Sequence, residues 1–131
     1  MIVFEDVTKD YKGGNHALKH VNLRIRKGDF VFVLGHSGAG KSTFIKLILR
    51  EEQVTSGRVL VDGLDLSTMK KRKVPYLRRR MGVVFQDFRL IPTMSVYENV
   101  AFAMRVTNIA EDKIKKRVPY VLGLVGLADK A

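Results

Sequence analysis

The stretch Gly35-His36-Ser37-Gly38-Ala39-Gly40-Lys41-Ser42 directly follows the apolar run FVFVL at positions 30–34. It has the form G-x-x-x-x-G-K-[ST], and residues 41–50 after it carry apolar side chains typical of a largely buried helix. A strand, such a loop and a helix in succession direct backbone N–H groups and a helix N-terminus at one point. The stretch therefore predicts a phosphate-binding loop between a strand covered on both faces, 30–34, and a helix, 41–50.

Each residue type in this loop has a use in binding a nucleotide. The glycines let the backbone wrap around phosphate without Cβ clashes, and Lys41 supplies a positive charge to the β- and γ-phosphates. Ser42 offers a hydroxyl to Mg²⁺, and Thr43 adds a donor for the α-phosphate. The alternative is a glycine-rich turn that binds nothing. The residues predicted to bind ATP or ADP here are Ser37, Gly38, Ala39, Gly40, Lys41, Ser42 and Thr43.

Length, charge and composition narrow the class of protein. A chain of 131 residues is one domain or part of one, and its apolar runs are too short to cross a bilayer. The N-terminal sequence MIVFEDVTKDY lacks the pattern of a secretory signal, and the absence of cysteine excludes a disulfide framework. We therefore expect a cytosolic protein. The net charge of +11 favours an anionic partner, whether nucleotide, nucleic acid or the inner face of a membrane.

Short strands and helices are expected to alternate along the chain. Residues 2–7, 21–25 and 58–61 carry strand patterns and are expected to form a small antiparallel sheet, with a turn at 12–15. Residues 82–86 repeat the buried-strand pattern of 30–34. A short helix is expected from Pro75 into the arginines that follow.

Two helices are expected in the last third of the chain. Ser95 and Glu98 have the spacing of a capping box, which predicts a helix from 96 to about 106. A final helix is expected to start near Glu111 and to be interrupted by Pro119 and Gly123.

Beyond the loop, the chain resembles the nucleotide-binding subunit of ABC-type transporters over essentially its whole length. Tyr11 matches the family's aromatic residue that stacks on adenine. Gln86, in VVFQD at 83–87, matches the glutamine whose side-chain carbonyl approaches Mg²⁺ and the attacking water. Alone, such a tyrosine is more often core or surface filler, and such a glutamine is a polar strand end. Their order around the glycine loop carries the resemblance.

The resemblance implies a fold and a domain organisation. The expected fold is α/β, a truncated P-loop NTPase (ABC ATPase) fold with a small antiparallel β subdomain and the start of a helical subdomain. Residues 1–93 would form the β subdomain and the P-loop core through the glutamine loop, and residues 94–131 would begin the helical subdomain.

Three segments narrow the resemblance within the family, namely 35–40, 74–87 and 96–100. They look like the ATPase of the bacterial cell-division complex; ATPases of lipoprotein release, macrolide export and amino-acid uptake are the alternatives. The resemblance implies a subunit on the cytoplasmic side of the bacterial membrane. Its full-length form would be a homodimer that couples ATP binding and hydrolysis to an FtsX-like permease.

Three motifs that ABC ATPases need do not occur in the sequence: an LSGGQ-like signature, an acidic Walker B strand end with its glutamate, and a switch histidine. We therefore expect the N-terminal part of a longer protein. In this chain, Lys41 and Gln86 are the only candidate catalytic residues. Without the other groups, the transferring phosphoryl is incompletely stabilised, and we expect nucleotide binding without appreciable turnover. Exposed apolar surface and self-association are expected as well.

Two further segments allow two interpretations each. The basic residues at 70–73 and 78–80 form either a solvated face or a contact with anionic lipid. Phe88, Leu90, Ile91 and Pro92 are either core or the surface that receives a coupling helix of the membrane partner. A basic nucleic-acid-binding module is the remaining alternative for the whole chain, and it is disfavoured because 70–80 holds only one aromatic residue, Tyr76.

Overall fold

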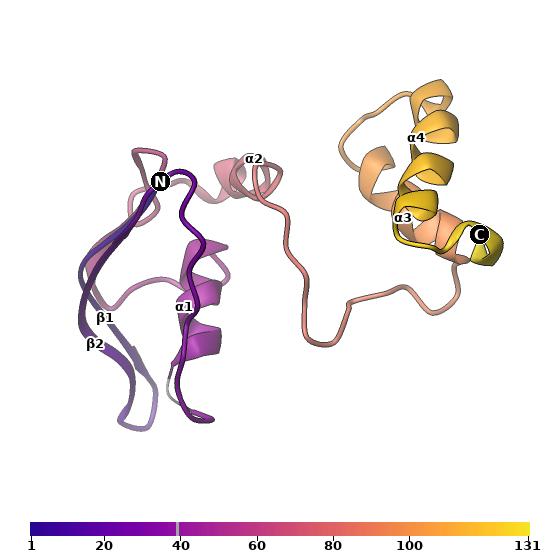
Figure 1. Cartoon of the computed structure of the whole chain (residues 1–131). Coiled ribbons are helices and arrows are strands. Elements are labelled where there is room, and N and C mark those ends of the chain that lie inside the picture. The colour runs from indigo at the N-terminus through magenta and orange to yellow at the C-terminus, as the bar shows by residue number, and fades with distance from the viewer. Residues whose placement is uncertain (39) are drawn as a thin grey trace. The chain divides into compact units, whose positions relative to one another are not determined.

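The computed structural model describes residues 1–38 and 40–131. They fall into two compact units, Met1–Met81 and Gly82–Ala131. The first unit holds a sheet and short helices, and the second holds a helical hairpin (Figure 1). The domain boundary expected between 93 and 94 stays a prediction about the organisation of the complete domain.

The first unit is built on a four-stranded antiparallel sheet in the order β2-β1-β3-β4. The strands are β1 (Ile2–Tyr11), β2 (Asn15–Ile25), β3 (Ser56–Val61) and β4 (Leu64–Asp65). Ile2 lies opposite Ile25 on β2 and Val61 on β3, so β1 is flanked on both sides. The small antiparallel sheet predicted from alternating apolar residues is therefore confirmed, with longer strands than expected.

One helix covers this sheet and forms its core. Helix α1 (Lys41–Ile48) turns Phe44 and Leu47 into a buried cluster with residues of β1 and β3. The rings of Phe4 and Phe44 stack at 4.7 Å between centroids, which fixes α1 against β1. The helix predicted after the glycine loop is confirmed, and Figure 1 shows it beside the β1–β2 ribbon.

The predicted short helix near Pro75 is also present. A 3-10 turn, η1 (Lys71–Lys73), leads into α2 (Val74–Arg78), with Pro75 in the first turn of α2.

The strands predicted at 30–34 and 82–86 are wrong. Among the described residues, both segments lie outside the helices and strands, and Figure 1 draws them as tubes. Phe30 and Leu34 are 85% and 87% exposed. A strand requires a neighbouring strand that supplies backbone hydrogen bonds. In the sheet of the described chain, β2 and β4 are the edge strands, and neither segment pairs with them. The apolar run predicted burial on both faces, and that burial is absent here.

The second unit packs two helices against each other. Helix α3 (Val96–Arg105) and helix α4 (Glu111–Leu124) bury Ala101, Ile114, Val118 and Leu122, and a 3-10 turn, η2 (Ala128–Lys130), follows. One of the two hydrogen bonds of the predicted capping box is confirmed, since the backbone N of Glu98 donates to Ser95 Oγ at 3.1 Å. The interruption predicted at Pro119 and Gly123 is wrong, because α4 continues through both. None of the helices in the described parts is long and apolar enough to cross a membrane.

Candidate nucleotide-binding site

The glycine loop leads into the N-terminus of α1 through two residues with positive φ. Gly38 has φ 81° and Gly40, the residue before the helix, has φ 88°. A Cβ on Gly40 would lie 2.3 Å from the carbonyl oxygen of Ala17 on β2, so this position excludes any side chain. No side chain caps the helix, and its first turn holds no acidic residue. The positive end of the helix dipole is therefore not neutralised by a carboxylate of the helix's own first turn.

Lys41 folds its side chain back over the loop that it follows. Its Nζ donates to the carbonyl oxygens of Gly35 and His36, the second at 2.7 Å. The ammonium thus lies inside the curve of the loop, where the sequence predicts phosphate oxygens. Phosphate oxygens are stronger acceptors for an ammonium than neutral carbonyls, so a bound phosphate would replace these two bonds at little cost.

Tyr11 and Thr43 meet across β1 and α1. The Tyr11 hydroxyl and Thr43 Oγ1 are 3.2 Å apart, Tyr11 is partly exposed, and Thr43 is buried. Lys9 Nζ lies 4.9 Å from the centroid of the Tyr11 ring. The structure therefore brings Tyr11 to the helix that begins with Lys41 and Ser42, and it leaves Ser42 exposed. Ala39, also predicted to bind nucleotide, lies outside the described residues.

Gln86 belongs to the second unit, so no distance joins it to Lys41 or Ser42. Its side chain is exposed, and two non-glycine residues with positive φ follow it, Phe88 at 58° and Arg89 at 46°. Non-glycine residues rarely adopt this conformation, and two in succession make a sharp turn. The Arg89 guanidinium lies 3.8 Å from the centroid of the Phe85 ring and covers it.

The segment after this turn exposes apolar side chains, and its backbone is hydrogen-bonded by a side chain of α3. Phe88 and Leu90 are 71% and 66% exposed, so the interpretation of these two residues as core is wrong for this structure. Asn99 on α3 bonds to the backbone of Ile91, Met94 and Ser95. Sequence reasoning missed this role. The available signal was an asparagine in the first turn of a helix after a loop, where its side chain readily bonds nearby backbone.

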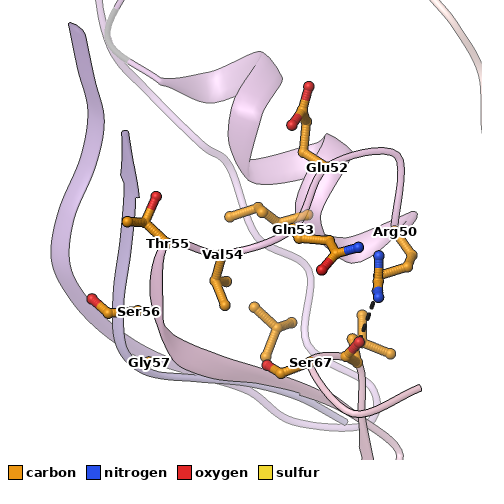
Figure 2. A pocket seen from close by; sticks show the side chains of 11 residues that line it. Arg50, Glu52, Gln53, Val54, Thr55, Ser56, Gly57 and Ser67 are labelled. Carbon is orange, nitrogen blue, oxygen red and sulfur yellow. Dashed lines mark hydrogen bonds between the residues drawn. The ribbon is translucent and has the colours of Figure 1, made fainter. Parts of the chain in front are cut away.

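A separate pocket of about 260 Å³ lies at the C-terminal end of α1, away from the glycine loop (Figure 2). Its charged residues are already engaged: Arg50 Nε donates to Leu66 O at 2.7 Å, and Glu52 pairs with Lys9 at 2.9 Å. None of the described residues of 35–43 lines it. The pocket is therefore a junction between α1 and β3 and is separate from the predicted phosphate-binding loop.

The side chains whose pKa departs clearly from its ordinary value lie outside the glycine loop. A hydrogen bond from Arg105 lowers the pKa of Glu111, and Arg105 also binds Glu98 at 2.5 Å. The amino terminus, through its hydrogen bond to Asp62, lowers the pKa of that carboxyl. Among the described residues, no cluster of three or more histidine, aspartate or glutamate side chains could hold a metal ion.

Comparison with known proteins gives the same family from sequence and from structure. The family model described as ABC transporter matches residues 18–131. The cell division ATP-binding protein FtsE of Bacillus subtilis (strain 168) is 51% identical over 131 residues, which cover 100% of this chain and 58% of that protein. FtsE of Escherichia coli (strain K12) is 44% identical over 131 residues, covering 100% and 59%. The methionine import ATP-binding protein MetN of Helicobacter pylori (strain HPAG1) is 45% identical over 130 residues, covering 99% and 40%.

Among solved structures, a dimeric ATP-binding cassette in a post-hydrolysis state, bound to ADP and Pi, superposes with a TM-score of 0.84. It is 35% identical in sequence, and the match covers 94% of this chain and 56% of that one. The chain thus spans less than two thirds of the length of these relatives. The predicted fold class is confirmed: the chain has part of the fold of an ATP-binding cassette.

Proposed function

Because this chain belongs to the ABC transporter family, we propose that it forms part of the ATP-binding subunit of a bacterial membrane complex. The specific assignment is FtsE of the cell-division complex FtsEX, which the 51% identity to the Bacillus protein supports. An ATPase of amino-acid uptake is the second candidate, supported by the 45% identity to the methionine import protein.

One observation carries the proposal of nucleotide binding: Lys41 is folded over a glycine loop that ends at an uncapped helix N-terminus. These groups are a cation, a positive dipole end and a loop backbone with three glycines that lack Cβ atoms, and together they suit a phosphate chain. The related cassette bound to ADP and Pi supports the same site. Tyr11, which reaches Thr43, would place its ring against adenine.

Ser42 and Gln86 are proposed to hold Mg²⁺ together with phosphate oxygens. The ion would neutralise charge on the β- and γ-phosphates. The exposed hydroxyl of Ser42 and the exposed amide of Gln86 offer one neutral oxygen each, which fits an ion that retains several waters.

We propose that the chain by itself binds ATP or ADP without appreciable turnover. Phosphoryl transfer depends on a positioned nucleophile and on several charges around the transferring group. Lys41 supplies a positive charge at the glycine loop. The first turn of α1 contains no carboxylate that could act as a general base. Lys41-dependent turnover in a steady-state ATPase assay would contradict this proposal.

The membrane partner would be an FtsX-like permease that docks on the segment after Gln86. Phe88 and Leu90 are exposed, and their loop is fixed by Asn99, so the segment presents apolar side chains on a rigid base. The complete protein would act as a homodimer on the cytoplasmic side of the membrane. Replacing Phe88 or Leu90 with Asp should abolish permease binding and leave nucleotide binding intact.

The first test is titration with a fluorescent ATP analogue, with and without Mg²⁺. Lys41→Ala removes charge-assisted bonds to phosphate and should weaken binding roughly tenfold to a hundredfold. Lys46→Ala is the matched control, because it removes an exposed cation from the same helix. Equal binding by both variants would refute the site. Binding that a polynucleotide displaces better than ATP would support the nucleic-acid alternative instead.

A further inference from the structure

An exposed aromatic side chain flanked by cations lies on η1 and α2. Tyr76 is 60% exposed, with Lys73 Nζ 5.9 Å and Arg79 Cζ 5.2 Å from its ring centroid. Lys71 and Arg72 are exposed on the preceding turn. We call these five residues, Lys71, Arg72, Lys73, Tyr76 and Arg79, the Tyr76 patch.

The patch faces solvent because the other side of α2 is anchored. Val74 and Leu77 are buried at 8% and 2% exposure. Arg78 donates from Nε to Leu49 O at 2.9 Å and so ties α2 to the end of α1. Since these inward residues alternate with Lys73, Tyr76 and Arg79, packing itself presents the aromatic ring and its cations on one outer face.

Basic residues dominate the stretch of chain that carries this face. Residues 70–80 contain seven basic residues and no acidic one. Arg80 pairs with Asp62 at 3.0 Å, but Lys71, Arg72 and Lys73 form no ion pair within the part of the chain that the structure describes. Glu51 and Glu52 line a pocket together with Lys71, and Glu52 is paired with Lys9.

We propose that the Tyr76 patch binds the anionic headgroups of a lipid membrane. Lysine and arginine near a bilayer are attracted by its negative surface potential, and their long side chains extend toward the headgroups. Tyrosine favours the same depth, because its ring is apolar and its hydroxyl is polar. The patch combines both features on an anchored surface. This inference does not depend on nucleotide binding, since none of its residues lies in the glycine loop.

The surroundings of the Tyr76 ring favour a membrane over a nucleic acid as the partner. Base stacking requires an open aromatic face and is strongest where several aromatic residues follow one another. Here Tyr76 is the only aromatic residue in 70–80, and two cations already compete for its ring.

The test is co-sedimentation of the 131-residue chain with two kinds of vesicle, phosphatidylcholine alone and phosphatidylcholine mixed with phosphatidylglycerol. We expect binding to the mixed vesicles only, and binding should decline as salt is raised. Lys71→Gln with Lys73→Gln should lower the partition coefficient about fivefold for each cation removed. Equal binding to both kinds of vesicle would overturn the proposal.

The matched control is Lys115→Gln with Lys116→Gln. It removes the same charge from exposed positions of α4, a helix that begins with the acidic residues Glu111 and Asp112. The control should retain nearly full binding; an equal loss would mean that net charge alone, and not the patch, attracts the chain.

A second pair of variants tests the aromatic contribution without disturbing the fold. Tyr76→Ala should weaken binding to the mixed vesicles, and Tyr76→Phe should preserve most of it, while circular dichroism stays unchanged in both because the side chain is exposed. Lys41→Ala should bind vesicles normally, which separates this inference from the proposed function. Preferential binding to a polynucleotide over the mixed vesicles would overturn the proposal in favour of nucleic acid.

Discussion

The side-chain amide of Asn99 binds both backbone polar groups of Ile91. Asn99 Oδ1 accepts from Ile91 N at 2.8 Å, and Asn99 Nδ2 donates to Ile91 O at 3.2 Å. The same Nδ2 donates to Met94 O and Ser95 O at 3.1 and 3.0 Å. One side chain therefore gives the loop before α3 the backbone partners that a strand would otherwise provide.

Asn99→Ala should release this loop. The free energy of unfolding of the second unit should fall by about 1–3 kcal/mol, because part-buried backbone groups lose their partners. Amide hydrogen exchange at Ile91 should accelerate. Asn99→Asp is the matched control, since its carboxylate still accepts from Ile91 N but no longer donates to the three carbonyls. Unchanged exchange at Ile91 in Asn99→Ala would show that the amide does not hold the loop.

Gly40→Ala should destabilise the first unit more than Gly38→Ala does. Both glycines have positive φ, which costs an alanine about 1–2 kcal/mol. A Cβ at Gly40 would also lie 2.3 Å from Ala17 O, whereas nothing lies within 4 Å at Gly38. Urea unfolding of the two variants separates the backbone penalty from the steric one. Equal destabilisation would mean that β2 yields to the added methyl group.

The elements that the sequence predicts correctly are those whose own residues carry a clear pattern. Alternating apolar residues mark β1 and β2, which are joined by a short turn, and they also mark β3, which pairs with β1 from far along the chain. The glycine loop marks the start of α1, although the buried residues of α1 pack on β1 and β3. The start of α3 is set by Ser95 and Glu98 three residues apart. In these cases the local pattern places the element, even where its partners are distant in sequence.

The errors arise where partners are distant or where packing outweighs propensity. The run 30–34 has strand composition, but a strand forms only when another segment pairs with it. Pro119 costs a helix interior about 3 kcal/mol, yet α4 buries Ile114, Val118 and Leu122. Burial of each such side chain contributes about 1.5–3 kcal/mol, which exceeds that cost in sum. Neither outcome can be inferred from residues adjacent in sequence.

Tyr11→Ala should weaken the binding of ATP but not that of inorganic tripolyphosphate. If the ring stacks on adenine, its loss costs about 1–3 kcal/mol, whereas the phosphates are held by the glycine loop. Tyr11→Phe should bind ATP nearly normally, because it loses only the hydroxyl contact with Thr43. Calorimetric titration with both ligands gives the measurement. A parallel loss for ATP and tripolyphosphate in Tyr11→Ala would instead indicate a structural role through Thr43.

Arg105→Gln should raise the pKa of Glu111 toward its ordinary value of 4.5. The lowered pKa means that Glu111 stabilises the folded state above its unfolded pKa, and that this stabilisation is lost as pH falls through the folded pKa. The stability difference between the native chain and Arg105→Gln should therefore shrink below about pH 4.5. A carboxyl titration by NMR checks the pKa directly. Lys115→Gln should produce a smaller rise, because Lys115 acts on Glu111 through charge alone.

The exposed run 30–34 should make the chain self-associate. Phe32 is 75% exposed, and five consecutive apolar residues with high strand propensity and no charge form a surface that other chains can pair with. Light scattering should show larger species as the concentration rises. Phe32→Lys places a charge within the run and should shift the chain toward monomer, whereas Tyr120→Lys, at an exposed position of α4, should not. A single monomeric species of the native chain at every concentration would show that exposure of 30–34 does not drive association.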